Sequence, residues 1–164
     1  MKKVLFLATL AVAFVLTSCN GVNSLPEKLR DPIKDMDKAC KEYFQDEDDY
    51  EYKGVKVEDK NIVFTVKISK DELDGKTLKQ WAKKKAKKDG FYNYDNMSKE
   101  EIAGYLCGKT FAGVDDDLDE EEVYPLLKKE KYNLVFRFVG KDSDDKVEIK
   151  VSHKDMPDYD KDED

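Results

Sequence analysis

Residues 62–68 read Ile-Val-Phe-Thr-Val-Lys-Ile, and this stretch decides the fold class. Its apolar residues recur at every second position, which is the period of a strand that buries one face. A weaker strand pattern covers residues 50–57, and Asp59-Lys60-Asn61 between the two patterns is typical of a turn. Together these features predict a β-hairpin. The residues expected on its buried face in the stronger strand are Ile62, Phe64, Val66 and Ile68.

A second pair of strand patterns lies toward the C-terminal end of the chain. Residues 132–139 and 146–151 both alternate between core-facing apolar positions and more polar ones. Residues 140–145 between them contain glycine, serine and aspartates, which favour a turn. This region therefore predicts a second β-hairpin.

The long segment between the two hairpins is predicted to be helical. Thr77 with Gln80 and Ser98 with Glu101 have the spacing of a capping box, in which a hydroxyl and a side-chain carbonyl or carboxylate satisfy the first free backbone amides of a helix. Asp89-Gly90 is a typical ending for the first of these helices. We therefore expect at least two helices in this insertion.

Apolar side chains also recur at helical spacing before the first hairpin, and the spacing predicts a helix over 32–45. Asp31 and Pro32 suit the N-cap and the first helical position. The side chains expected on the buried face of this helix are Ile33, Met36, Cys40, Tyr43 and Phe44.

The predicted fold class is α+β. The N-terminal helix should pack on a four-stranded antiparallel sheet, with a helical insertion between two β-hairpins. This element order loosely resembles that of the cystatin-like and nuclear-transport-factor-like folds, in which a helix lies across a curved sheet. The resemblance rests on element order and not on a motif, and a fold alone does not give a function.

The first 19 residues are typical of an export signal. Lys2 and Lys3 precede an apolar run over 4–15, which is too short to remain as a membrane-spanning helix. The run ends at Leu16-Thr17-Ser18-Cys19, which resembles the lipobox of bacterial lipoproteins. The resemblance implies cleavage before Cys19, a diacylglycerol on its thiol, and fatty acyl chains such as palmitate. The alternatives are an ordinary signal with a chance cysteine and an uncleaved anchor.

The resulting organisation has four parts. We predict a lipoprotein signal peptide over 1–18, a lipidated tether over 19–30, a single α+β domain over 31–155, and a disordered acidic tail over 156–164. In lipoproteins of the enterobacterial type, aspartate at the position of Asn20 favours retention in the inner membrane. We therefore expect a lipid-anchored protein of the cell envelope, at the outer membrane and facing the periplasm, with exposure at the cell surface as the alternative.

The composition limits both partners and cofactors. The chain has 30 Lys and Arg against 37 Asp and Glu, which gives a formal net charge of −7. A negative charge and an exported location argue against binding to nucleic acid, which depends on cationic contacts with phosphates. With Cys19 lipidated, Cys40 and Cys107 remain as a candidate disulfide, and two separate buried thiols are the alternative. No cofactor is predicted.

The sequence contains no set of residues with catalytic spacing. His153 is the only histidine, and its direct neighbours in a strand would point to the opposite face. The acidic run after residue 114 places carboxylates at Asp115, Asp117 and Asp119, but the EF-hand pattern fails at its glycine and at its final glutamate. We therefore predict no metal site, with these three aspartates as weak candidates, and a protein that is not an enzyme.

Two surface features remain as candidates for function. Seven lysines between positions 76 and 88 form a basic cluster on the first predicted helix of the insertion, where Trp81 is expected to lie in the core. Phe91, Tyr92 and Tyr94 follow in a loop. Aromatic side chains in a loop either anchor an interface or pack against the sheet.

The predicted function is a non-enzymatic binding or interaction module, held at the membrane by the lipid on Cys19, whose partner is another envelope protein. One alternative is a protein with a small-ligand pocket between helix and sheet. Another is a cystatin-like enzyme inhibitor. A helix-facing side of the sheet that is filled by side chains would favour a partner-binding surface, and a cavity with polar groups would favour a ligand.

Overall fold

The computed structural model describes residues 21–111, 120–140, 145–156 and 158. The lipobox and the three candidate metal-binding aspartates lie outside the described residues, so the lipid anchor stays a prediction and the three aspartates stay weak candidates. Among the residues that are described, no helix is long and apolar enough to cross a membrane.

The N-terminal helix starts earlier than the sequence predicted. A short 3-10 helix, η1 (Val22–Ser24), leads into α1 (Glu27–Phe44), which contains Pro32 in its second turn. The prediction that α1 begins at residue 32 and that residues 21–30 only act as a tether is therefore wrong. The physical reason is burial, because Leu25 and Leu29 are 1% and 0% exposed and belong to the core.

Four strands form a single mixed sheet in the order β1-β2-β3-β4. The strands are β1 (Tyr50–Glu58), β2 (Asn61–Ile68), β3 (Asn133–Gly140) and β4 (Lys146–Val151). Both predicted hairpins are present, since β1 pairs antiparallel with β2 and β3 pairs antiparallel with β4. However, β2 and β3 pair in parallel, so the prediction of a purely antiparallel sheet is wrong.

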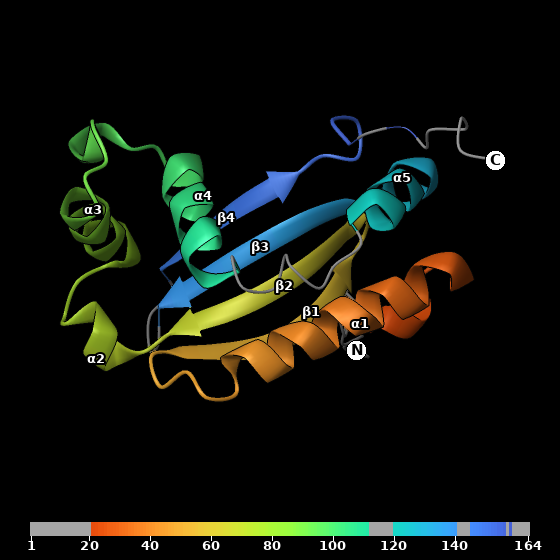
Figure 1. Cartoon of the computed structure of the whole chain (residues 1–164), viewed down its shortest axis with the longest axis horizontal. Coiled ribbons are helices and arrows are strands. Elements are labelled where there is room, and N and C mark those ends of the chain that lie inside the picture. Colours follow the sequence, from red (N-terminus) through yellow and green to blue (C-terminus); the bar gives the residue numbers. More distant parts are fainter. Residues whose placement is uncertain (1–20, 112–119, 141–144, 157, 159–164) are drawn as a thin grey trace, which may run out of the picture.

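The helical insertion explains the parallel pairing. It contains α2 (Lys70–Leu73), α3 (Leu78–Lys88), η2 (Tyr94–Asn96), α4 (Lys99–Thr110) and α5 (Glu120–Glu130). In Figure 1, α2 and α3 lie at the end of the sheet where β2 finishes, and α5 lies at the opposite end, beside the start of β3. The insertion thus returns the chain to the end where β2 began, and a strand that starts there must run parallel to β2.

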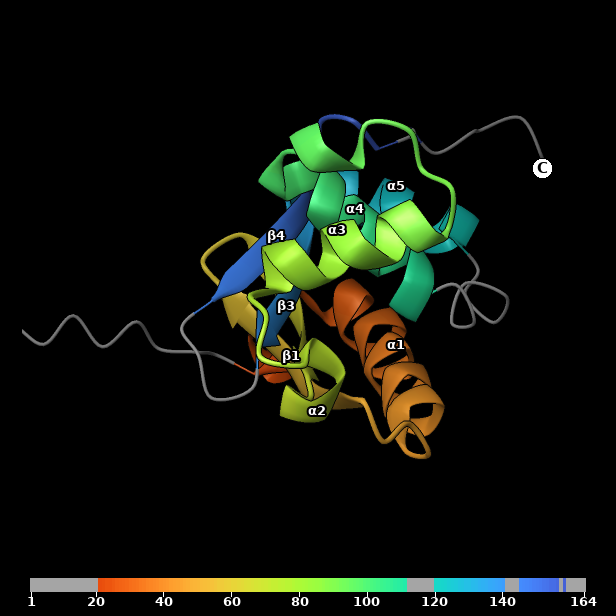
Figure 2. The same ribbon diagram turned by 90° about the vertical axis from the view of Figure 1, so that its left-hand side faces the viewer.

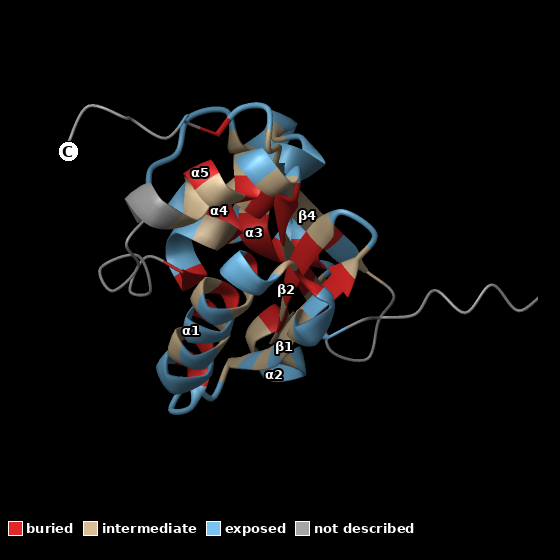
Figure 3. Ribbon diagram, turned by 90° about the vertical axis from the view of Figure 1, so that its right-hand side faces the viewer, coloured by how far each residue is buried: buried red, intermediate tan, exposed pale blue. Residues whose placement is uncertain are grey.

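The helices cover one face of the sheet, and the core lies between these two layers. Figures 1 and 2 show α1 over β1 and α4 over β3 and β4. The helix-facing side chains of β2 are fully buried, and Phe111 connects α1 with β3 by packing edge-on against Phe44 and Phe138. Figure 3 shows the buried residues concentrated between the helices and the sheet. The helix-facing side is therefore filled where these side chains lie.

The other face of the sheet carries an ion-pair network. The guanidinium of Arg137 donates two hydrogen bonds of 2.9 Å to Glu58, and its Nε donates one of 2.6 Å to Glu148. Glu58 lies on β1 and Arg137 on β3, so this pair crosses β2 and helps to cover Val63, which is 1% exposed. The hydrogen bonds from Arg137 lower the pKa of Glu58. The network thus connects three strands on the side that lacks helices.

The domain also extends beyond its predicted C-terminal boundary. Met156, which the sequence analysis assigned to the disordered tail, is 3% exposed and packs in the core. Asp158 pairs with Lys128 of α5 at 2.9 Å. The other residues of the predicted tail, 157 and 159–164, lie outside the described part of the chain.

Candidate binding surface

A groove runs between the loop that follows α3 and the exposed side of α4. We call it the α4 groove, and its volume is about 530 Å³. It is lined by Phe91, Tyr92, Asn93, Asn96, Met97, Glu101, Gly104, Tyr105, Gly108 and Lys109. Its lining therefore joins two of the three aromatic residues named from the sequence to one face of a helix.

The ending of α3 determines where the loop goes. Gly90 has a φ of +81°, a conformation that glycine adopts without steric cost. The backbone amide of Phe91 donates to the carbonyl of Ala86 at 3.0 Å, as in a Schellman motif. This motif turns the chain sharply and places Phe91 beside α4. The predicted Asp89-Gly90 ending of α3 is confirmed.

The three aromatic residues of the loop have different environments. Phe91 is 51% exposed and packs edge-on against Tyr105, with ring centroids 5.3 Å apart. Tyr92 is 97% exposed. Tyr94 is half-buried against the core, with the ammonium of Lys87 5.0 Å from the centre of its ring. Phe91 and Tyr92 therefore belong to the groove, whereas Tyr94 anchors the loop to the core.

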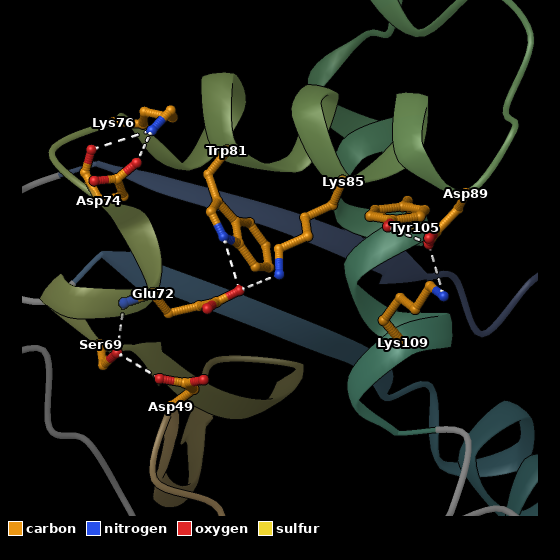
Figure 4. Close-up of polar contacts among 10 residues, drawn as sticks. All are labelled: Asp49, Ser69, Glu72, Asp74, Lys76, Trp81, Lys85, Asp89, Tyr105 and Lys109. Atoms are coloured by element: carbon orange, nitrogen blue, oxygen red, sulfur yellow. Dashed lines mark hydrogen bonds and ion pairs between the residues drawn. The ribbon is translucent and has the colours of Figure 1, made fainter.

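Two polar residues of the groove lining, Tyr105 and Lys109, both contact Asp89. The hydroxyl of Tyr105 donates to a carboxylate oxygen of Asp89 at 2.7 Å, and the ammonium of Lys109 lies 2.7 Å from the same atom (Figure 4). The hydrogen bonds from Lys109 and Tyr105 lower the pKa of Asp89. Burial and the hydrogen bond to Asp89 raise the pKa of Tyr105. At neutral pH these three side chains are therefore a neutral phenol and an ion pair.

The floor of the groove is the exposed face of α4, where two glycines lie one helical turn apart. A side-chain carbon added at Gly108 would meet no atom within 4 Å, whereas one at Gly104 would lie 3.5 Å from Ile149 of β4. Gly108 thus leaves the floor bare, whereas a side-chain carbon at Gly104 would be in ordinary van der Waals contact with the sheet. The sequence analysis did not identify this floor, although the four-residue spacing of the glycines was a signal for it.

Two contacts fix α3 relative to the rest of the domain. The carboxylate of Glu72 in α2 accepts a hydrogen bond of 3.1 Å from Nε1 of Trp81 and pairs with Lys85 at 2.5 Å (Figure 4). At the start of α3, the backbone amide of Leu78 donates to Asp145 at 2.6 Å. Trp81 is 3% exposed, so its predicted place in the core is confirmed.

The solvent-facing side of α3 carries a row of lysines without an intervening acid. We call it the lysine face, and it consists of Lys79, Lys83, Lys84, Lys87 and Lys88. Figure 2 shows α3 at the front of this end of the molecule. Residues 78–88 contain no aspartate or glutamate. The lysine face is therefore a local positive surface on a protein with a net negative charge.

The candidate cysteine pair is present as two thiols in this structure. Cys40 is buried in α1, and Cys107 is half-buried in α4. Burial, together with the negative charge of Asp37, raises the pKa of Cys40 to about 12. Cys107 also contributes to this rise, which places the two thiols within electrostatic range of each other. The disulfide stays a prediction.

The contacts of the single histidine support the fold. The Nδ1 atom of His153 lies 2.9 Å from the side-chain oxygen of Asn133, and its backbone amide donates to the same oxygen at 3.0 Å. These contacts anchor the chain after β4 to the start of β3. Within the described ranges, no group of three or more histidine, cysteine, aspartate or glutamate residues could hold a metal ion.

A second, more polar groove of about 440 Å³ lies between the end of α1 and the start of β1. Glu47, Asp48 and Glu51 give it an acidic lining, and Tyr50 and Tyr52 form its apolar part. Both tyrosines are half-buried and pack against the core. This groove therefore lacks the protruding aromatic side chains that distinguish the α4 groove.

The fold and this surface define a two-layer α+β domain with an aromatic groove beside a basic helix. No protein family, no curated protein and no solved structure matches this chain.

Proposed function

We propose that this protein is a lipid-anchored, non-enzymatic interaction module of the cell envelope, and that the α4 groove is where it binds its partner, another envelope protein. The observation that carries the proposal is the exposure of Phe91 and Tyr92. Three large hydrophobic side chains are exposed among the described residues, and two of them stand next to each other at this groove. Exposed aromatic side chains beside a groove are typical of binding sites.

The expected lipid on Cys19 would orient this surface away from the membrane. Only Asn20 separates Cys19 from Gly21, the first described residue, so the link can reach about 7 Å. In Figure 1, η1 and the start of α1 lie at one end of the long axis, and α3 lies at the other. A domain held through its N-terminal end would therefore present α3 and its loop to a partner in the surrounding compartment.

The chemistry of the α4 groove favours binding over catalysis. The carboxylate of Glu101 accepts a hydrogen bond from the amide of Ser98 and caps α4, and Asp89 is paired with Lys109. These side chains already serve the fold. A general base needs a carboxylate or an imidazole within reach of a substrate proton, and the one histidine lies after β4, outside this groove.

A small ligand is the second candidate occupant. The groove volume of about 530 Å³ falls within the usual range of ligand pockets. However, it lies on the surface beside α4, whereas the sequence analysis expected a ligand pocket between helix and sheet. The cystatin-like inhibitor stays an alternative that rests only on element order, although the sheet is mixed and not purely antiparallel.

Site-specific photocross-linking in the native envelope tests the proposal. Benzoylphenylalanine replaces Tyr92 in one variant, and in the matched control it replaces Lys150, an exposed residue of β4 that faces away from the helices. We expect one dominant cross-linked protein from position 92 and none from position 150. The same products from both positions, or no product from position 92, would refute the groove as the binding site.

A further inference from the structure

We propose that the partner is an acidic protein segment, which lies along the lysine face of α3 and inserts an aromatic or aliphatic side chain into the α4 groove. This inference rests on the proposed function and adds the chemistry of the partner. It combines two surfaces that are continuous in the structure but serve different kinds of contact.

Part of the lysine cluster is available for an external partner. Lys76, Lys85 and Lys87 already contact Asp74, Glu72 and Tyr94, respectively. Three other lysines are exposed and form no ion pair or hydrogen bond with another described residue. These are Lys79, Lys84 and Lys88.

The nearby carboxylates do not neutralise these three ammonium groups. Lys84 contributes to the lowered pKa of Asp74 and Lys88 to that of Asp89, but the largest causes are the hydrogen bonds from Lys76 and Lys109, respectively. Each of these carboxylates therefore has a lysine of its own. In a protein with a net charge of −7, such a surface attracts acidic molecules locally, while the rest of the protein repels them.

The lysine face leads directly into the groove. Lys87 extends over the ring of Tyr94, in the loop that also carries Phe91 and Tyr92. Lys109 lies on the opposite wall, beside Tyr105. Phe91 and Met97 also line the groove, and methionine adapts its shape to different apolar partners. A segment that follows the lysines would thus place its next side chain against an apolar surface.

The packing of α3 argues against an anionic membrane as the occupant. A helix that binds in the membrane interface turns a broad apolar face toward the lipid. The large apolar residues of α3, Leu78 and Trp81, are 0% and 3% exposed because they face the core. In addition, α3 lies at the opposite end of the domain from η1, which follows the expected lipid anchor. A protein partner accounts for both the lysines and the exposed aromatics.

The test uses the purified full-length protein in detergent and a defined probe, the random copolymer of glutamate and tyrosine. Controls are polyglutamate, the copolymer of lysine and tyrosine, and heparin. We expect the glutamate–tyrosine copolymer to bind at least tenfold more tightly than the lysine–tyrosine copolymer. Its affinity should fall as the salt concentration rises. Polyglutamate should bind more weakly, because it cannot fill the groove. Equal binding of heparin would indicate a general site for polyanions and would overturn the proposal.

Two variants with the same charge change provide the matched comparison. One carries Lys79→Glu, Lys84→Glu and Lys88→Glu, and the other reverses three exposed lysines elsewhere. The control substitutions are Lys28→Glu, Lys129→Glu and Lys150→Glu. We expect the α3 variant to lose about tenfold in affinity for the copolymer, and the control to stay within about threefold. Equal losses in both would overturn the proposal, and circular dichroism shows whether each variant is folded.

The outcomes also separate this inference from the proposed function. A specific cross-link from position 92 without copolymer binding would keep the groove as a binding site and overturn the acidic partner. Absence of both would refute both proposals. A cross-link between two copies of this chain would replace the foreign partner with self-association. The acidic turn that includes Asp46, Glu47 and Asp48 would then be the segment to examine, because it is exposed at the same end of the molecule as α3.

Discussion

Replacing Glu72 by alanine removes the carboxylate that connects α2 to α3. In the folded protein this side chain is 18% exposed, accepts the indole hydrogen bond of Trp81 at 3.1 Å and pairs with Lys85 at 2.5 Å. Trp81 is 3% exposed, so its N–H group would lose its acceptor at a site with little access to water. The lysine face lies on the same helix, and the substitution therefore affects both stability and the proposed site.

The expected loss follows from the two contacts. A buried donor left without a partner costs about 1–3 kcal/mol. The ion pair with Lys85, whose side chain is 42% exposed, adds less than about 1 kcal/mol because water screens it. We therefore expect Glu72→Ala to lower the free energy of unfolding by about 2 kcal/mol. Glu72→Gln keeps an oxygen acceptor for the indole and should lose less than about 1 kcal/mol.

Urea unfolding followed by tryptophan fluorescence measures these values, because Trp81 is the only tryptophan in the chain. Its emission should also move to longer wavelength in Glu72→Ala if the end of α3 loosens. The matched control is Glu100→Ala, at an exposed position on α4. The reasoning would be wrong if Glu72→Ala and Glu72→Gln were equally stable, or if both matched the control.

Three further predictions follow from other parts of the structure. Arg137→Met should lower the free energy of unfolding by about 1 kcal/mol at pH 7. Because Arg137 lowers the pKa of Glu58, this contribution is present above the pKa of an unfolded glutamate and is lost as pH falls below about 4. The stabilities of the wild type and the variant should therefore converge in acid denaturation. Convergence at high pH instead would contradict the assignment. Cys40 should resist iodoacetamide in the folded protein at pH 8, since it is 1% exposed and has a pKa of about 12. Alkylation after unfolding without reductant, followed by mass spectrometry, then distinguishes two alkylated thiols from the predicted disulfide. Rapid labelling of the native protein would refute the burial of Cys40. Gly108→Leu should keep the free energy of unfolding or raise it by up to about 1 kcal/mol, because leucine favours a helix and a side-chain carbon added there meets no atom within 4 Å. The same substitution should reduce cross-linking from position 92, because the leucine side chain fills the groove. Unchanged cross-linking would show that the partner does not contact the floor of the groove.

Local patterns in the sequence predicted several elements correctly. The alternation over 62–68 placed β2, and the turn at Asp59-Lys60-Asn61 placed the first hairpin. The two capping boxes are both formed, with Thr77 bonded to Gln80 and Ser98 bonded to Glu101. These features were readable because each depends on residues within about four positions of one another, which interact whatever the rest of the chain does.

The start of α1 and the whole of α5 were missed because their cause is not local. Residues 21–30 read as a polar spacer, but Leu25 and Leu29 find a place in the core that only the assembled sheet provides. Helix α5 contains Pro125 and was not predicted, although Leu127 is fully buried. In both cases tertiary burial outweighs a weak local preference.

The candidate site shows the same division. The sequence alone determined that Phe91, Tyr92 and Tyr94 share a loop after a lysine-rich helix, because neighbours in sequence stay neighbours in the fold. The α4 groove was decided by the tertiary structure, which brings that loop against the glycine-bearing face of the next helix. The parallel pairing of β2 with β3 was decided in the same way. Strand direction depends on the end of the sheet to which the long insertion delivers the chain, and no local pattern encodes that.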